Sequence, residues 1–350
     1  MEKYKHLNIS SIERLTPSAV KVNFEIPEGE KEHFHFIPGQ YITIKTHLNG
    51  AEVRRSYSIC SGKEENTISV GIKKVEDGLF SKYANDHLES GVQLEVHPPE
   101  GRFTFDAGKD QASTVIAFAA GSGITPIMSI MKEVLNKTQK NFILVYGNKS
   151  LEETMFHKDI RNLVSEYPDR LQVQLLYSRE QNEDALFGRI ERSTVNFILK
   201  NKVDSPKNCL FYLCGPEEMI NNVSDTLVTQ GIEKDKIKFE LFSSGDDSTE
   251  IPATTHDGKT QVTVLVDDEE YTLVMDKKQR VLDAVLKEDI DAPYSCQGGI
   301  CSSCIARVKE GKVEMVKNQI LTDSELEEGL ILTCQSHPVT STLSIDYDDV

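Results

Sequence analysis

The sequence YSCQGGICSSC, residues 294–304, decides how the last quarter of this 350-residue chain folds. It holds three cysteines, Cys296, Cys301 and Cys304, although the whole chain has only seven. Two adjacent glycines between them give the backbone the freedom to curl around a bound group. Three kinds of structure compete for such a segment: a disulfide clasp, a zinc site and an iron–sulfur cluster.

The spacing of the cysteines separates these alternatives. The three form C-x4-C-x2-C, and a fourth, Cys334 in LTCQSHP, follows after 29 intervening residues. This is the spacing of plant-type [2Fe–2S] clusters, whereas structural zinc sites favour two short cysteine pairs. A glycine-rich loop also aims its amides at the cluster sulfides. We therefore predict that Cys296, Cys301, Cys304 and Cys334 ligate a [2Fe–2S] cluster, with zinc as the main rival.

Composition and charge narrow the class of protein. A hydrophobic content of 38% and a charged content of 27% fit a globular protein. The start, MEKYKHLNIS, is polar, and the apolar runs are too short to cross a bilayer, so we expect no signal peptide, no membrane association and a cytoplasmic location. Thiols stay reduced there, which disfavours the disulfide alternative. The formal net charge of −17 disfavours nucleic acid as a partner and suits a protein with a basic patch.

The pattern along the chain predicts a multidomain protein. Residues 1–106 show short strands between turns, which predicts an antiparallel β-barrel. Residues 107–245 alternate apolar strands with helices, which predicts an α/β domain with a parallel sheet. A segment rich in Gly, Pro, Ser and Thr predicts a linker at 246–258. Residues 259–350 carry 18 acidic and 9 basic side chains, a net charge of −9, which supports a separate module.

The predicted barrel holds a candidate flavin site. A cluster that takes single electrons from a hydride donor needs a flavin as converter. The segment RRSYSI, residues 54–59, offers a guanidinium for a pyrophosphate, a tyrosine ring, and the hydroxyls of Ser56 and Ser58 for a flavin edge. The strand, turn and helix that follow add Gly71, Lys73, Gly78, Leu79, Phe80 and Ser81. Gly78 to Ser81 are positioned to open a helix whose unpaired N–H groups bind phosphate, with an ordinary strand–turn–helix as the alternative.

Three turns at predicted strand ends are candidates for a nicotinamide nucleotide. In AAGSGITPIMSIM, a glycine turn lets the backbone approach a pyrophosphate, although Pro126 replaces the third glycine of G-x-G-x-x-G. In LYSRE, a serine and an arginine at a strand end could hold a ribose 2′-phosphate or could be solvated loop residues. In CGP, a glycine turn ends the last apolar strand, and Pro216 is expected at the first helical position. The candidate residues are Gly121, Gly123, Thr125, Ser178, Arg179, Cys214, Gly215 and Pro216.

Together these motifs resemble the ferredoxin–NADP reductase superfamily fused to a C-terminal plant-type ferredoxin domain, an α+β fold of the β-grasp type. RRSYS is similar to the R-x-Y-S flavin motif, GSGITP to the nicotinamide-side turn and CGP to the last strand end, and residues 260–350 resemble a ferredoxin throughout. The resemblance implies FAD, with Arg55 on the pyrophosphate, Tyr57 against the isoalloxazine and Ser58 near its reactive nitrogen.

The resemblance also implies how the nucleotide binds. It places Gly121, Gly123, Thr125 and Cys214 around the nicotinamide, with Ser58 and Cys214 as the catalytic residues. Ser178 and Arg179 match the NADPH-preferring pattern, with NADH possible. Phe242 in ELFSS is the candidate aromatic for the other face of the flavin, with core packing as the alternative.

The domain order resembles the reductase subunits of the phenylacetyl-CoA epoxidase group, the multicomponent oxygenases of phenylacetate breakdown. It implies electron transport from NAD(P)H through FAD and the cluster to an oxygenase component. Similar patterns serve steroid hydroxylases, and the phthalate-type reductases share the order but use FMN. A general reductase for several acceptors and a redox-sensing binding module remain as alternatives.

Overall fold

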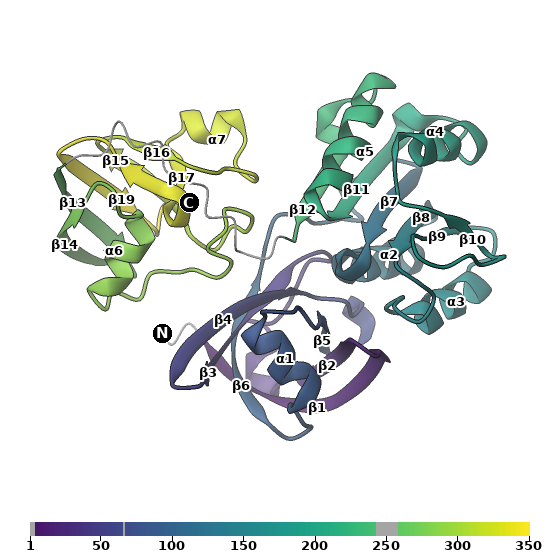
Figure 1. Ribbon diagram of the computed structural model, residues 1–350, viewed down its shortest axis with the longest axis horizontal. Coiled ribbons are helices and arrows are strands. Elements are labelled where there is room, and N and C mark those ends of the chain that lie inside the picture. Colours follow the sequence, from purple (N-terminus) through teal and green to yellow (C-terminus); the bar gives the residue numbers. More distant parts are fainter. Residues whose placement is uncertain (1–3, 66, 243–257) are drawn as a thin grey trace. The chain divides into compact units, whose positions relative to one another are not determined.

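The computed structural model describes residues 4–65, 67–242 and 258–350. The chain divides into two compact units, residues 1–242 and 243–350, and each is described by itself (Figure 1). The predicted linker at 246–258 lies outside the described residues except for Gly258, so its role stays a prediction. None of the helices in the described part of the chain has the length and apolar character needed to span a bilayer.

The first part of the larger unit is a closed antiparallel sheet with one helix. Its elements are β1 (Lys5–Thr16), β2 (Ala19–Glu25), η1 (Glu28–Glu30), β3 (Tyr41–Leu48), β4 (Ala51–Ser58), η2 (Lys63–Glu65), β5 (Ile68–Lys73), α1 (Leu79–Asp86) and β6 (Gln93–Glu100). The strand order is β4-β3-β6-β1-β2-β5, with antiparallel pairing throughout. The edge strands β4 and β5 meet through a bridge between Ile59 and Val70, which closes the sheet into the predicted barrel.

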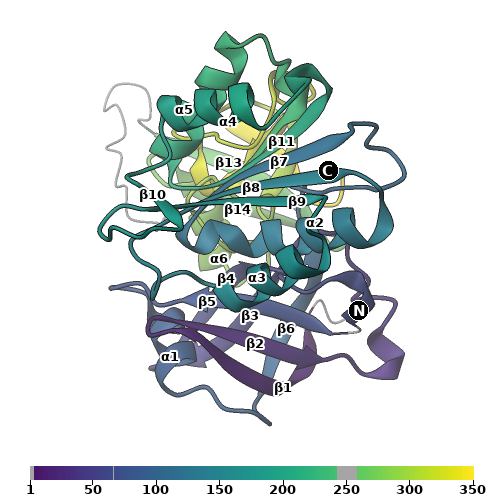
Figure 2. The same ribbon diagram turned by 90° about the vertical axis from the view of Figure 1, so that its right-hand side faces the viewer.

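The second part of the larger unit is a parallel sheet with helices on both faces. Its elements are β7 (Thr114–Ala120), η3 (Gly121–Gly123), α2 (Ile124–Lys137), β8 (Asn141–Asn148), α3 (His157–Glu166), β9 (Leu171–Tyr177), β10 (Ala185–Phe187), α4 (Arg192–Asn201), η4 (Pro206–Asn208), β11 (Cys209–Gly215), α5 (Glu217–Thr229), η5 (Lys234–Lys236) and β12 (Ile237–Leu241). The order is β10-β9-β8-β7-β11-β12, and every pairing is parallel. Helices α4 and α5 cover one face, and α2 and α3 the other (Figure 2).

Burial explains why these strands are apolar runs in the sequence. Every residue of β11 is buried, as expected for a central strand covered on both faces. Helix α2, Ile124–Lys137, has eleven buried residues. The prediction that Pro216 opens the last helix is wrong by one residue, because its ψ of 141° is extended, so it caps a helix that begins at Glu217.

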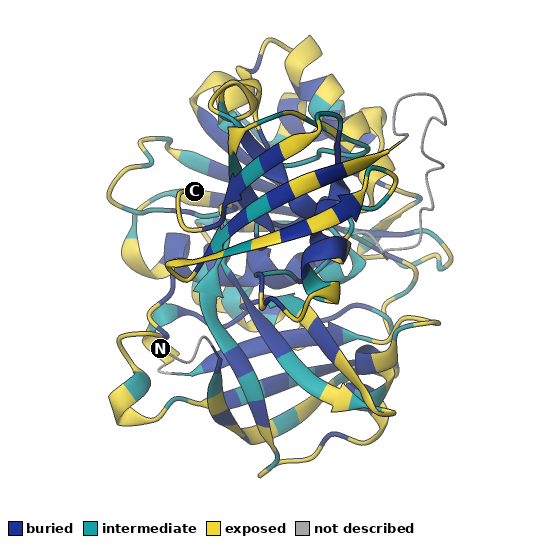
Figure 3. Cartoon of the chain, turned by 90° about the vertical axis from the view of Figure 1, so that its left-hand side faces the viewer, coloured by how far each residue is buried: buried dark blue, intermediate teal, exposed yellow. Residues whose placement is uncertain are grey.

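The smaller unit is a mixed sheet with a packed helix. Its elements are β13 (Lys259–Val266), β14 (Glu269–Asp276), α6 (Val281–Lys287), β15 (Ile305–Glu310), β16 (Val313–Met315), α7 (Asp323–Glu327), β17 (Leu330–Leu332), η6 (Thr333–Gln335), β18 (Ser336–Pro338) and β19 (Thr342–Asp346). The main sheet has the order β14-β13-β19-β15-β17, and only β13 and β19 pair in parallel. Buried and exposed residues alternate along β13, so one face of the sheet forms the core with α6 (Figure 3). The predicted multidomain architecture is therefore confirmed.

Candidate functional site

The two arginines of the flavin motif point to opposite sides of β4. The side chain of Arg54 is buried, and its Nε lies 2.8 Å from Glu52 and its guanidinium 5.3 Å from the centroid of the Tyr4 ring. Arg55 is exposed, and it donates to the carbonyl of Arg54 at 2.7 Å. Because successive residues of a strand face opposite sides, Arg54 packs on the barrel and Arg55 faces solvent, and its contact with a cofactor stays a prediction.

Tyr57 and the start of α1 lie together beside this strand. The ring of Tyr57 is half-buried, and its centroid lies 5.7 Å from that of buried Phe80. At the helix start, a Cβ on Gly78 would lie 2.2 Å from Ser81 Oγ, so a larger residue there would displace the Ser81 side chain. The first intrahelical bond runs from Lys82 N to Gly78 O at 3.1 Å, so the amides of residues 79–81 have no acceptor within the helix. Phosphate binding by these amides stays a prediction.

Lys73 was predicted to bind the cofactor, and the structure gives its ammonium a protein partner. Lys73 Nζ lies 3.2 Å from Glu153, and Ser18 donates to the same carboxylate at 2.8 Å. Burial raises the pKa of Glu153, but the hydrogen bonds from Ser18 and Lys73 outweigh it and lower the pKa overall. Lys73 thus joins the barrel to the parallel-sheet domain, and a contact with flavin stays a prediction.

The glycine turn η3 packs against the end of β11. A Cβ on Gly123 would lie 2.2 Å from the carbonyl oxygen of Cys214, so this close approach of two backbones requires glycine. Gly121 has a φ of +54° and open space around its Cα, which leaves room for a ligand. A Cβ on Gly71 would lie 2.7 Å from Thr125 Cγ2, so β5 of the barrel contacts the first turn of α2. The predicted flavin and nicotinamide motifs therefore meet within one compact unit.

Sequence reasoning missed Glu240, which lies between the two predicted catalytic residues. The hydroxyl of Ser58 donates to Glu240 Oε2 at 3.2 Å, and Cys214 is the register partner of Glu240 across β11 and β12. Burial raises the pKa of Glu240 to about 8, against the hydrogen bond from Ser58 that lowers it. Burial, aided by the charge of Glu240, also raises the pKa of the Cys214 thiol. Both shifts favour the neutral forms of the Glu240 carboxyl and the Cys214 thiol.

Ser178 and Arg179 follow directly after β9. Their amides donate to the carbonyls of Asn148 and Lys149, at 3.0 and 2.9 Å, and so extend the ladder between β8 and β9. The guanidinium of Arg179 is exposed, and no other residue in the described ranges pairs with it. The pair lies at the carboxyl edge of a parallel sheet, where such sheets bind ligands. Phe242 packs against the buried core of this domain, as the packing alternative expected.

The four predicted cluster ligands come together as two pairs of thiols. All seven cysteines of the chain lie in described residues and are free thiols. The hydrogen bond from Cys301 lowers the pKa of Cys296 to about 6, and a hydrogen bond from Cys304 lowers that of Cys334. In the described ranges, three metal-binding side chains nowhere converge on one point. Two pairs of thiols suit the two irons of a [2Fe–2S] cluster.

Backbone and side-chain donors point at these thiols. The amide of Gly298 donates to Cys296 Sγ at 3.3 Å. The side chain of buried Gln335 donates to the carbonyl of Gln297 at 2.8 Å and to Cys334 Sγ at 3.8 Å. N–H donors aimed at sulfur are what an iron–sulfur cluster requires, so the residues present fit this group.

Three family models match the chain in the order of its structural parts. They are an oxidoreductase FAD-binding domain at residues 6–105, an oxidoreductase NAD-binding domain at 118–225 and a 2Fe-2S iron-sulfur cluster binding domain at 264–339. The matches fall within the three predicted domains, whose boundaries stay a prediction.

Two curated relatives match almost end to end. The chain is 33% identical to one of the subunits of 1,2-phenylacetyl-CoA epoxidase from Escherichia coli strain K12, over 99% of both chains. It is 32% identical to the ferredoxin reductase component of 3-ketosteroid-9-alpha-monooxygenase from Rhodococcus rhodochrous, over 97% of this chain and 96% of that protein.

Solved structures share the fold. Phthalate dioxygenase reductase matches 98% of both chains, with a TM-score of 0.61 and 22% identity. An intact type IV self-sufficient cytochrome P450 monooxygenase matches 98% of this chain over 41% of its own length, with a TM-score of 0.72 and 20% identity.

Proposed function

The chain belongs to the family of oxygenase reductases in which an FAD-binding, an NAD-binding and a 2Fe-2S domain follow one another, and we propose that it passes electrons from NADPH to an oxygenase component. The observation that carries this proposal is the chain of contacts from Ser58 through Glu240 to Cys214, which joins the flavin motif to the nicotinamide turn. FAD bound at this site would supply the conversion of a hydride into single electrons for the cluster.

Different residues of the larger unit would bind different parts of FAD and of the nicotinamide nucleotide. Arg55 and the amides at the start of α1 would hold the phosphates of FAD. The ring of Tyr57 would contact the flavin, and the hydroxyl of Ser58 would be its polar neighbour. Cys214 and the glycine turn place the nicotinamide. The raised pKa of Glu240 favours its neutral form, which would limit the negative charge that it places beside the reacting groups.

The smaller unit holds the cluster through Cys296, Cys301, Cys304 and Cys334. The amide of Gly298 and the side chain of Gln335 stabilise negative charge on the sulfurs. The preference for NADPH over NADH rests on Ser178 and Arg179, since a guanidinium at a strand end can bind a ribose 2′-phosphate.

For the acceptor, we propose a phenylacetyl-CoA epoxidase, because the match to a component of that enzyme spans both chains nearly completely. The ketosteroid and glycine betaine monooxygenase reductases among the relatives make another oxygenase the second candidate. Reduced thiols and the metal-type cysteine spacing support a cytoplasmic location.

The visible spectrum of the anaerobically purified protein tests the proposal. Flavin bands with broad cluster absorption, bleached faster by one equivalent of NADPH than by NADH, are expected. A spectrum without cluster bands, or bands that neither nucleotide bleaches, would contradict a reductase and favour a zinc site or a redox-sensing module. Added oxygenase component should then turn over with this reductase, and a phenylacetyl-CoA epoxidase should do so faster than a steroid oxygenase.

A further inference from the structure

Helix α2 contacts both halves of the proposed flavin–nicotinamide site. It begins directly after the glycine turn, and its first turn packs on β5 through Thr125. One to two turns later it reaches the segment 60–65, which follows the flavin motif in the chain. Along a helix, the seven steps from Thr125 to Lys132 span about 10 Å.

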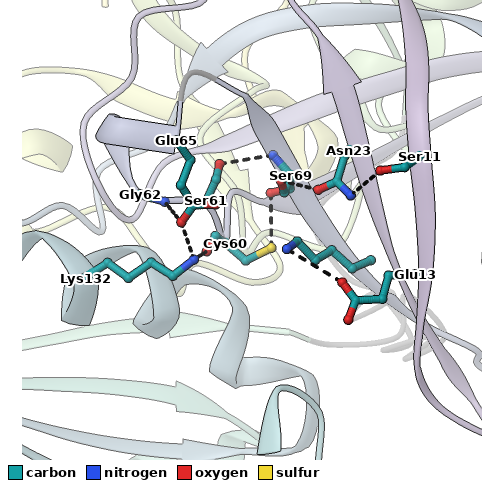
Figure 4. Close-up of polar contacts among 10 residues, drawn as sticks. Ser11, Glu13, Asn23, Cys60, Ser61, Gly62, Glu65, Ser69 and Lys132 are labelled. Atoms are coloured by element: carbon teal, nitrogen blue, oxygen red, sulfur yellow. Dashed lines mark hydrogen bonds and ion pairs between the residues drawn. The ribbon is translucent and has the colours of Figure 1, made fainter. Parts of the chain in front are cut away.

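Two side chains of α2 hold the backbone of this segment. Ser129, which is fully buried, donates to the carbonyl of Ser61 at 2.8 Å. Lys132 donates to the carbonyl of Cys60 at 3.2 Å and to the carboxylate of Glu65 at 2.5 Å (Figure 4). Cys60 is only two residues beyond Ser58, so these bonds act on the end of the flavin-motif strand.

Further hydrogen bonds hold the segment in place where Lys132 binds it. The same Glu65 carboxylate accepts from the amide of Gly62 at 2.9 Å. The amide of Ser69 donates to the hydroxyl of Ser61 at 3.1 Å. The hydroxyl of Ser69 donates to Asn23 at 2.6 Å, so the polar contacts continue into the barrel strands (Figure 4).

We propose that Lys132 is a positioning residue. It fixes β4, the strand of the flavin motif, at a set distance from the glycine turn η3. This inference rests on the proposed reductase function. Hydride transfer requires reacting atoms about 3–3.5 Å apart, and misplacement by about 1 Å can cost roughly 100-fold in rate. Lys132 is suited to this role because its side chain is only 16% exposed and binds a backbone carbonyl as well as a carboxylate.

The same helix offers a matched control. Lys137 pairs with Glu64, the neighbour of Glu65, so both ion pairs join α2 to η2. The Lys137 side chain is 44% exposed, and its partner is a carboxylate rather than a backbone carbonyl. Lys137→Met therefore removes a lysine ion pair from α2 without releasing the Cys60 carbonyl.

The test compares Lys132→Met, Lys137→Met and wild type, as full chains loaded with FAD and cluster. Flavin reduction by saturating NADPH in a stopped-flow instrument should be about tenfold or more slower in Lys132→Met alone. The FAD content and the dissociation constant for NADPH should be unchanged. Hydrogen exchange of the amides in residues 60–69 should be faster in Lys132→Met than in Lys137→Met, which is a readout independent of activity.

An unchanged limiting rate in Lys132→Met would overturn the inference, as would equal slowing in both variants. If Lys132→Met does not fold, Ser129→Ala replaces it and is expected to slow flavin reduction in the same way; an unchanged rate there would also overturn the inference. Absence of flavin reduction in wild type would instead overturn the proposed function.

Discussion

The hydroxyl of Ser58 donates a hydrogen bond to Glu240 across 3.2 Å, and this contact joins β4 of the barrel to β12 of the parallel sheet. Glu240 is half-buried, and burial raises its pKa to about 8 from an ordinary value of 4.5. The folded protein therefore binds the Glu240 proton more tightly than the unfolded chain does. Its contribution to stability is fully present below about pH 4.5 and is lost as the pH rises through about 8.

Glu240→Gln should flatten this part of the stability profile. The amide is neutral at every pH and can still accept from Ser58. Between pH 6 and pH 8.5, we expect the Tm of wild type to fall a few degrees more than that of Glu240→Gln, since about 1 kcal/mol moves the Tm of a unit this size by roughly 2–4 °C. Calorimetry at both pH values measures the difference. Glu233→Gln, at an exposed carboxylate, should keep the wild-type slope, and parallel slopes in all three proteins would refute the assignment.

Removing one cluster ligand should empty the smaller unit of iron without affecting the larger one. Cys334→Ala leaves Cys304 without its paired thiol, so we expect iron to fall from about two atoms per chain to near zero. FAD content and flavin reduction should persist, because the flavin motifs lie in the other compact unit. Cys209→Ala, at a buried thiol whose pKa burial raises to about 11, should keep its iron. Full iron in Cys334→Ala would exclude this cysteine as a ligand.

Gln335 should tune the potential of the cluster. Its side chain donates to Cys334 Sγ at 3.8 Å and to the carbonyl of Gln297 at 2.8 Å. A donor to sulfur stabilises the more negative, reduced state, so Gln335→Leu should make the potential more negative. A loss of about 0.5–1 kcal/mol corresponds to roughly 20–40 mV for a one-electron couple. Redox titration followed by electron paramagnetic resonance measures the shift, and exposed Gln261→Leu serves as the control. A potential equal to wild type would show that this bond has no such effect.

The sequence predicts best what depends on neighbouring residues. The cysteine spacing is a local pattern, and the structure brings the four thiols together as two pairs. Glu240 was not predicted as a site residue, because nothing in the sequence KFEL, residues 238–241, distinguishes it from any other carboxylate. Its role appears only through the register that places it beside Cys214 and the fold that brings Ser58 to it.

Lys73 is the opposite case: the sequence predicts that it binds the cofactor, and the structure pairs it with a protein carboxylate. The sequence shows a cation beside a flavin motif, but it cannot show that Glu153, 80 residues later, pairs with it. The role of Lys132 could likewise not be predicted, because the backbone carbonyl that it binds, that of Cys60, lies 72 residues away in the sequence. Which lysines lie at the site therefore depends on contacts between segments that are far apart in the sequence.

Arg179 should determine the choice between the two nucleotides. Its guanidinium is exposed at the end of β9, and its backbone is fixed by the bond to Lys149, so the side chain is presented at the ligand-binding edge of the sheet. Arg179→Leu should raise the KM for NADPH about 10–100-fold, because a charge-assisted pair with a phosphate contributes roughly 1.5–3 kcal/mol, and should leave the KM for NADH nearly unchanged. Steady-state ferricyanide reduction with each nucleotide measures both constants. Arg161→Leu, at an exposed arginine of α3, should alter neither. An equal rise in both KM values for Arg179→Leu would show that the residue binds a part common to the two nucleotides, and not the 2′-phosphate.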